Sequence, residues 1–131
     1  MMVFDPRTMA TPVYDALSGL RSQYNGNDTR LKEQKSQAVE LYTYLSTWGM
    51  MRLKAEEKAL SQDGKKDVVR QYFQCLQTLS DVQNLIGDQG LETLKNLGTE
   101  EYLGLTGLGL ALSQEFAFWA NAIYHDIKGE E

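Results

Sequence analysis

The sequence contains very little proline, cysteine or histidine. Its two prolines, Pro6 and Pro12, both lie near the start, so the rest of the chain lacks the residue that most strongly interrupts helices. Cys75 is the only cysteine and His125 the only histidine. One residue of each type cannot build a disulfide framework or a four-ligand zinc site. The composition therefore excludes a disulfide-stabilised scaffold and a zinc module of that kind.

Long apolar runs and a secretory start are also missing. The chain is uncharged for 13 residues from Tyr102 to Gln114, and Glu115 then interrupts. A membrane-spanning helix needs roughly 18 or more consecutive apolar residues. The start, MMVFDPRTMATP, has no basic region followed by a long apolar stretch, as a signal peptide would. A lone cysteine is compatible with a reducing compartment, so we expect a cytoplasmic protein with no membrane partner.

Acidic residues outnumber basic ones, 18 to 13, and the formal net charge is −5. This balance disfavours a freestanding nucleic-acid-binding protein, which usually carries an overall positive field. The charge is unevenly distributed, however. The span from Arg30 to Arg70 has nine basic and six acidic residues (9 − 6 = +3), which leaves 4 − 12 = −8 for the remainder.

Apolar residues recur at three- and four-residue steps along most of the chain, which is the period of an amphipathic helix. Thr11 and Pro12 are typical of a helix start, and Asp5-Pro6 of a short preceding turn. Gly49 is the expected position of a kink in the long second helix. The predicted helices cover residues 12–24, 29–60, 67–86, 91–97 and 99–128.

The glycines of the last segment, Gly104, Gly107 and Gly109, permit a second interpretation. They could belong to a phosphate-binding loop, but such loops follow a strand, and no strand pattern precedes Gly104. In a helix, Gly104, Gly107 and Ala111 would form a smooth stripe beside the apolar face. Each glycine costs about 1 kcal/mol relative to alanine in a helix. The stripe thus indicates close approach by another helix or a partner, or simple tolerance of glycine.

No segment shows a convincing strand pattern. We therefore predict an all-α fold, a compact bundle of four to five helices with two long helices. The whole chain, residues 1–131, is expected to be a single domain, with residues 1–10 as a loosely packed N-terminal arm.

Residues that could support catalysis are few. Cys75 lies on the apolar stripe of the third helix, where an inert packing role is common, and His125 falls at a helix end. The pairs Glu56-Glu57 and Glu100-Glu101 are adjacent in sequence, so their side chains point about 100° apart on a helix. The Glu-x-x-His pattern of di-iron bundles is absent, since Ala122 stands three residues before His125. We expect no enzyme activity, no metal and no cofactor.

The basic residues of the second and third helices suggest a strip facing phosphate groups, which would contact a nucleic-acid backbone without reading its sequence. The alternative is a solvated face with salt bridges, because Glu57 and Asp67 lie among these cations. Arg52 projects to the apolar side and could extend from the core edge or meet an acidic or phosphate group. The candidate nucleic-acid contacts are Arg52, Lys54, Lys58, Lys65, Lys66 and Arg70.

Phe116, Phe118 and Trp119 cannot all point the same way, because a helix turns 100° per residue. At least one should leave the core for a contact with another subunit. The candidate interface residues are Gly104, Gly107, Phe118 and Trp119.

Two stretches resemble the small helical subunit of type III CRISPR effector complexes. They are LYTYLSTWGMMRLKAEEKAL, residues 41–60, and EYLGLTGLGLALSQEFAFWANAIY, residues 101–124. The resemblance implies a non-catalytic RNA-proximal protein within a ribonucleoprotein complex. Its expected partners are other effector subunits, the guide RNA and target RNA, and copies of itself. A helical protein–protein adaptor with no nucleic-acid role remains the alternative.

Overall fold

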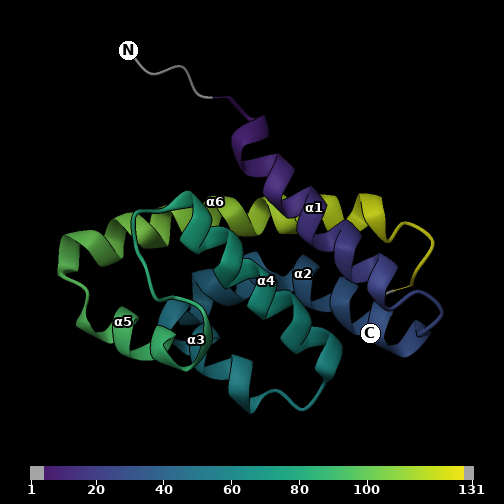
Figure 1. Ribbon diagram of the computed structural model, residues 1–131, viewed down its shortest axis with the longest axis horizontal. Helices are drawn as coiled ribbons and strands as arrows, with labels where there is room; N and C mark the ends of the chain where they lie inside the picture. The colour runs from purple at the N-terminus through teal and green to yellow at the C-terminus, as the bar shows by residue number, and fades with distance from the viewer. Residues whose placement is uncertain (1–4, 129–131) are drawn as a thin grey trace.

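The computed structural model describes residues 5–128 and consists of six α-helices and one short 3-10 helix (Figure 1). Within the described residues there is no strand, so the all-α prediction is confirmed and the helices form a compact bundle. The longest helices are α6 with 25 residues and α2 with 21. The elements are α1 Arg7–Gln23, α2 Asp28–Trp48, α3 Met50–Ala59, α4 Asp63–Leu79, η1 Gly87–Gln89, α5 Gly90–Asn96 and α6 Thr99–Ile123.

The predicted helix over 29–60 is two helices, which is why six are present where four to five were expected. Gly49 separates α2 from α3 and has φ 87° and ψ 169°. This backbone region is accessible essentially only to glycine. A kink was predicted at this residue, but the helix stops and starts again in a new direction.

The predicted helix over 67–86 ends early, at Leu79. Beyond it, the Gln77 side chain accepts a hydrogen bond from the Leu85 amide at 2.8 Å, which pulls this segment against the end of α4. Leu85 becomes fully buried and Ile86 is exposed, the reverse of what a continued helix would give. The helix ends here because the burial of Leu85 and this hydrogen bond compensate for the helical hydrogen bonds that are lost.

The first helix begins earlier than predicted, at Arg7 rather than near Thr11. The Asp5 carboxylate accepts hydrogen bonds from the Arg7 amide and guanidinium, which stabilises the first turn. Pro12 lies inside α1. Residues 7–10 are helical; Met9 is buried in the bundle, whereas Arg7 and Thr8 are exposed. The first four residues of the predicted arm lie outside the described part of the chain.

Helix α2 is the centre of the packing, because it lies against both α6 and α4, while α1 crosses α6 and α4 (Figure 1). The start of α2 meets the end of α6 where Tyr124 donates to Gln34, and its far end lies near Tyr102. α2 and α6 are therefore antiparallel. Their buried side chains join those of α4 in one core whose largest fully buried members are Tyr72, Tyr124, Phe73 and Phe116.

Close helix approach on α6 occurs at Gly109, not at Gly104 or Gly107. The Tyr72 hydroxyl donates to the Gly109 carbonyl at 2.8 Å, and a Cβ at Gly109 would lie 2.6 Å from that hydroxyl oxygen. It would also collide with the end of the Met50 side chain. At Gly104 and Gly107 a Cβ would meet nothing within 4 Å. The structure therefore requires glycine at one of the three positions only.

No helix within residues 5–128 combines the length and apolar character needed to span a membrane.

Two substitutions on α6 test this packing. We expect Gly109→Ala to lower the free energy of unfolding by about 1–3 kcal/mol, because the added methyl group overpacks the contact with Tyr72 and Met50. Gly107→Ala is the matched control and should raise it by about 0.5–1 kcal/mol through helix propensity alone. Urea unfolding followed by circular dichroism measures both; equal effects at the two positions would contradict the assignment.

Candidate interaction surfaces

Lys54, one of the six predicted nucleic-acid contacts, is buried. Only 4% of its surface is exposed, its Nζ lies 3.2 Å from Glu57 Oε1, and the ammonium sits 4.7 Å from the centre of the Phe73 ring. Its apolar stem passes close to Gly90 at the start of α5. The prediction that Lys54 lies on an exposed basic face is wrong, because its charge is neutralised inside the junction of α3, α4 and α5.

Arg52 is exposed on α3 and its guanidinium stacks on the Trp48 ring, 4.4 Å from the ring centre. Trp48 is itself 52% exposed. Nearby, burial is the main cause that raises the pKa of Tyr44, and Glu56 adds to the effect while Arg52 opposes it. Arg52 thus lies at the surface. Its contact with Trp48 connects α3 to the end of α2 across the break.

The other predicted basic contacts lie at or near the surface. Lys58 forms an ion pair with Asp88 at 3.0 Å in which both side chains are largely exposed, so the pair contributes little to stability. On α4, Lys65 and Lys66 are half-buried and Arg70 is exposed. Lys66 and Arg70 are four residues apart, so they share one face of this helix. The alternative of a solvated salt-bridged face also fails for Asp67, which is buried.

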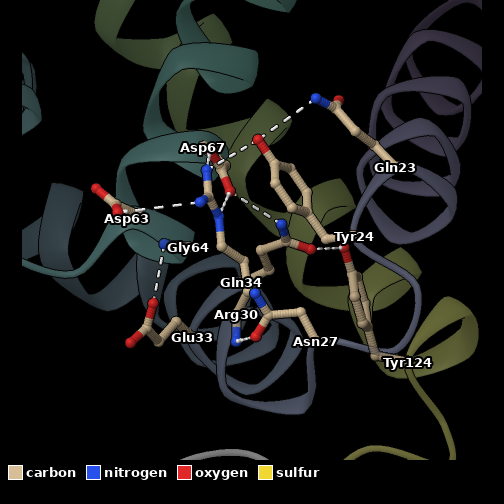
Figure 2. Close-up of polar contacts among 10 residues, drawn as sticks. All are labelled: Gln23, Tyr24, Asn27, Arg30, Glu33, Gln34, Asp63, Gly64, Asp67 and Tyr124. Atoms are coloured by element: carbon tan, nitrogen blue, oxygen red, sulfur yellow. Dashed lines mark hydrogen bonds and ion pairs between the residues drawn. The ribbon is translucent and has the colours of Figure 1, made fainter.

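Asp67 belongs to a polar network that the sequence did not reveal (Figure 2). Its two carboxylate oxygens accept hydrogen bonds from Arg30 Nε at 2.7 Å and Nη2 at 2.8 Å, and Gln34 donates a third at 3.0 Å. Gln34 in turn accepts from the Tyr124 hydroxyl at 2.7 Å. The network joins α2, α4 and the residue that follows α6.

Tyr24 and Asp63 also contact Arg30, whose Nη1 lies 3.9 Å from Asp63 Oδ2. The Arg30 guanidinium lies 3.9 Å from the centre of the Tyr24 ring and donates to its hydroxyl at 2.9 Å (Figure 2). The Asp67 carboxylate raises the pKa of Arg30 far above its usual range, chiefly through their hydrogen bonds. Arg30 is therefore fixed as a cation between the α1–α2 turn and α4. Its spacing of 37 residues from Asp67 gives no local sequence signal.

The exposed residues of α6 between Leu103 and Phe118 are uncharged, although Glu100 and Glu101 are exposed in the first turn and half-buried Glu115 borders them. We call Leu103, Gly104, Gly107, Ala111, Gln114 and Phe118 the outer face of α6; all six are exposed and none is charged. Leu103 is 65% and Phe118 61% exposed, the highest values among the large apolar side chains of the described residues. The predicted interface residues Gly104, Gly107 and Phe118 thus lie on one uncovered strip along the helix.

Trp119, the fourth predicted interface residue, lies beside this strip. Its half-buried ring makes edge contacts with Phe118 at 5.0 Å and with Tyr14 of α1 at 5.6 Å between ring centres. Its Nε1 is buried and has no hydrogen-bond acceptor among the described residues. Phe118 therefore leaves the core as expected, whereas Trp119 links the outer face of α6 to α1.

The residues considered for catalysis are separated. Cys75 is buried on α4, its thiol donates to the Pro12 carbonyl, and burial raises its pKa to about 11. A thiol of this kind is unreactive at neutral pH. His125 is exposed after the end of α6. Within residues 5–128, no three His, Cys, Asp or Glu side chains come together as metal ligands would.

One open hollow of about 410 Å³ is lined by Ser18, Arg21, Ser22, Asn25 and Ile123. Its cation, Arg21, already donates to Asp126 at 2.5 Å and to the Ile123 carbonyl at 2.6 Å. The hydrogen bond from Arg21 is the main cause that lowers the pKa of Asp126, to about 2. Arg21 is therefore already paired and is not available to bind an anionic ligand in this hollow.

Comparison of the chain with protein-family models, curated proteins and solved structures gives no match. The candidate interaction surfaces are the outer face of α6 and the exposed cations on α3 and α4.

We expect Asp67→Ala to lower the free energy of unfolding by about 3 kcal/mol, because it leaves the Arg30 charge and the Gln34 amide without their acceptor. Asp88→Ala breaks the exposed pair with Lys58 and should change stability by less than about 0.5 kcal/mol. Urea titration of both variants checks this, and a small effect at Asp67 would show that the network contributes little.

Proposed function

We propose that this protein is a non-catalytic small subunit of a type III CRISPR RNA-guided effector complex in the cytoplasm. In that role it stacks along the guide RNA–target duplex, contacts its backbone and binds other subunits or copies of itself. The proposal rests on the resemblance of residues 41–60 and 101–124 and on the outer face of α6, which is the observation that carries it.

The outer face of α6 has the properties of a protein interface. It is long, uncharged and bordered by the large side chains of Leu103 and Phe118, while its glycines let another backbone approach closely. Aromatic side chains are enriched, and charged ones depleted, at interface centres. Leu103, Gly104, Gly107 and Phe118 are exposed within residues 5–128, so this strip is available to a partner in an assembly.

RNA contact would be made by the exposed cations, Arg52, Lys58 and Arg70, with Lys65 and Lys66 beside them on α4. Lys54 is left out because its ammonium is buried against Glu57. Since the whole chain has a net charge of −5, these contacts depend on being positioned by the assembly.

A helical adaptor without a nucleic-acid role is the second candidate. It is favoured by the acidic total and by the partners of the cations, since Lys58 lies beside Asp88 and Arg52 stacks on Trp48. An adaptor would use the same outer face of α6.

The first test is mild affinity purification of the tagged protein from its native host, with measurement of particle mass and bound RNA. We expect a large particle that contains short RNAs of uniform length. A small RNA-free particle at low salt would contradict the CRISPR proposal and favour the adaptor.

The triple variant Arg52→Glu, Lys58→Glu, Arg70→Glu tests the RNA contacts. Each reversed charge would repel a phosphate, so we expect target RNA to bind the assembly at least about tenfold more weakly, with an unchanged circular dichroism spectrum. Lys54 is kept, because a glutamate in its buried position beside Glu57 would unfold the junction of α3 and α4.

The control for this test is Arg7→Glu, Lys32→Glu, Lys95→Glu, which makes the same change in net charge at exposed positions outside the proposed contacts. Equal loss of RNA in both triple variants would indicate a general charge effect. No loss in either would support the adaptor.

The outer face of α6 is tested by Leu103→Glu and Phe118→Glu. Both side chains are exposed, so we expect the isolated protein to keep its stability while its incorporation into the assembly falls at least about tenfold. Val39→Glu, at an exposed apolar residue of α2, is the control. Co-purification of wild-type and variant chains measures incorporation; full incorporation of both α6 variants would exclude this face as the interface.

A further inference from the structure

The break between α2 and α3 consists of a single residue. Gly49 still donates its amide to the Leu45 carbonyl as a helical residue would, and its carbonyl accepts from Leu53. Leu41, Leu45, Trp48 and Arg52 keep helical spacing across it. The sequence on both sides is therefore suited to one uninterrupted helix, and only the Gly49 backbone interrupts it.

The bend removes backbone hydrogen bonds that an unbroken helix would make. In such a helix the amides of residues 50–52 would donate to the carbonyls of residues 46–48. In the bent form the Met51 amide instead donates to the Tyr102 hydroxyl, at 3.2 Å. Gly49 itself holds φ 87° and ψ 169°, and no atom lies within 4 Å of a Cβ built there. The barrier to other residues at this position is thus the backbone conformation and not crowding.

We propose that Gly49 is a hinge for domain swapping with a second copy of this chain. When α2 and α3 join into one helix, α3–α6 separate from their own α1–α2 and pack on the α1–α2 of the other copy. Short strained hinges favour such exchange.

The swap preserves nearly all of the packing. The contact of Met50 with Gly109 lies within α3–α6 and moves with that unit. The hydrogen bond from the Met51 amide to the Tyr102 hydroxyl is replaced by a helical one. The contacts of α2 with α4 and α6, including Arg30 with Asp67, re-form between the two chains. The interactions that change lie at the hinge: the turn at Gly49, the hydrogen bond of the Met51 amide to Tyr102, and the contacts of Arg52 with Trp48 and Tyr44.

Apolar residues at the hinge give the swapped form a further contact. Trp48 and Met51 flank Gly49 and are 52% and 39% exposed. In a swapped dimer the two straightened helices pass each other at the hinge, which brings both copies of these side chains together. The bent form leaves this surface to solvent, so swapping buries it.

Gly49→Ala tests the hinge, because alanine favours the helix and is strained in the bent backbone. We expect its dimer fraction, measured by size-exclusion chromatography with light scattering, to rise about tenfold or more over wild type at equal concentration. Gly19→Ala, at an exposed helical glycine of α1 where a Cβ also meets nothing within 4 Å, should remain like wild type.

Charge reversal distinguishes a swapped dimer from an ordinary one. In the Gly49→Ala background, Arg21→Asp and Asp126→Arg each place two like charges at the contact between α1 and the end of α6. In a swapped heterodimer of the two variants, each half contains one positive and one negative residue at this contact. Co-refolded chains should therefore form heterodimers in excess of random pairing, whereas an ordinary dimer would pair at random.

Two results would overturn the proposal: a monomeric, folded Gly49→Ala protein, or dimers that pair at random. If Gly49→Ala does not fold, refolding of the wild-type chain at high concentration decides the question. A minor dimer that persists after dilution supports the hinge, and a purely monomeric product at every concentration rejects it.

Discussion

The Arg30–Asp67 ion pair joins the start of α2 to the start of α4 in a place where Asp67 is 6% and Arg30 22% exposed at the side chain. Two charges brought out of water are stable only if their geometry is good and their remaining bonding capacity is satisfied. Gln34, Tyr24 and Tyr124 meet that requirement, and they come from different parts of the chain (Figure 2). The polar junction at which α2, α4 and the end of α6 meet is centred on this contact.

Periodicity in the sequence predicted most helical segments, because side-chain burial repeats every three to four residues. It placed the start of the last helix at the observed residue, Thr99, and its end five residues beyond Ile123. It could not predict the break at Gly49, since the same apolar spacing continues through it and only the backbone angles differ. It also missed the end of α4 at Leu79, where a distant hydrogen bond from Leu85 to Gln77 competes with the helix.

The interaction surfaces were predictable to different degrees. The exposure of Gly104, Gly107 and Phe118 followed from their projection on one helix. The burial of Lys54 did not, because its contact with Phe73 depends on how α3 lies on α4. Arg30 was missed for the same reason. A cation's neighbours in space decide whether it faces solvent, and Phe73 beside Lys54 and Asp67 beside Arg30 are remote from them in sequence.

The uncharged strip on α6 and the cations of α3 and α4 respond oppositely to ionic strength. Salt weakens contacts between lysine or arginine and phosphate, because counterion release becomes less favourable. Contacts through apolar side chains are not screened in this way, and salts such as sulfate strengthen them. An assembly held through the outer face of α6 would therefore keep its protein–protein contacts under conditions that remove nucleic acid from its basic residues.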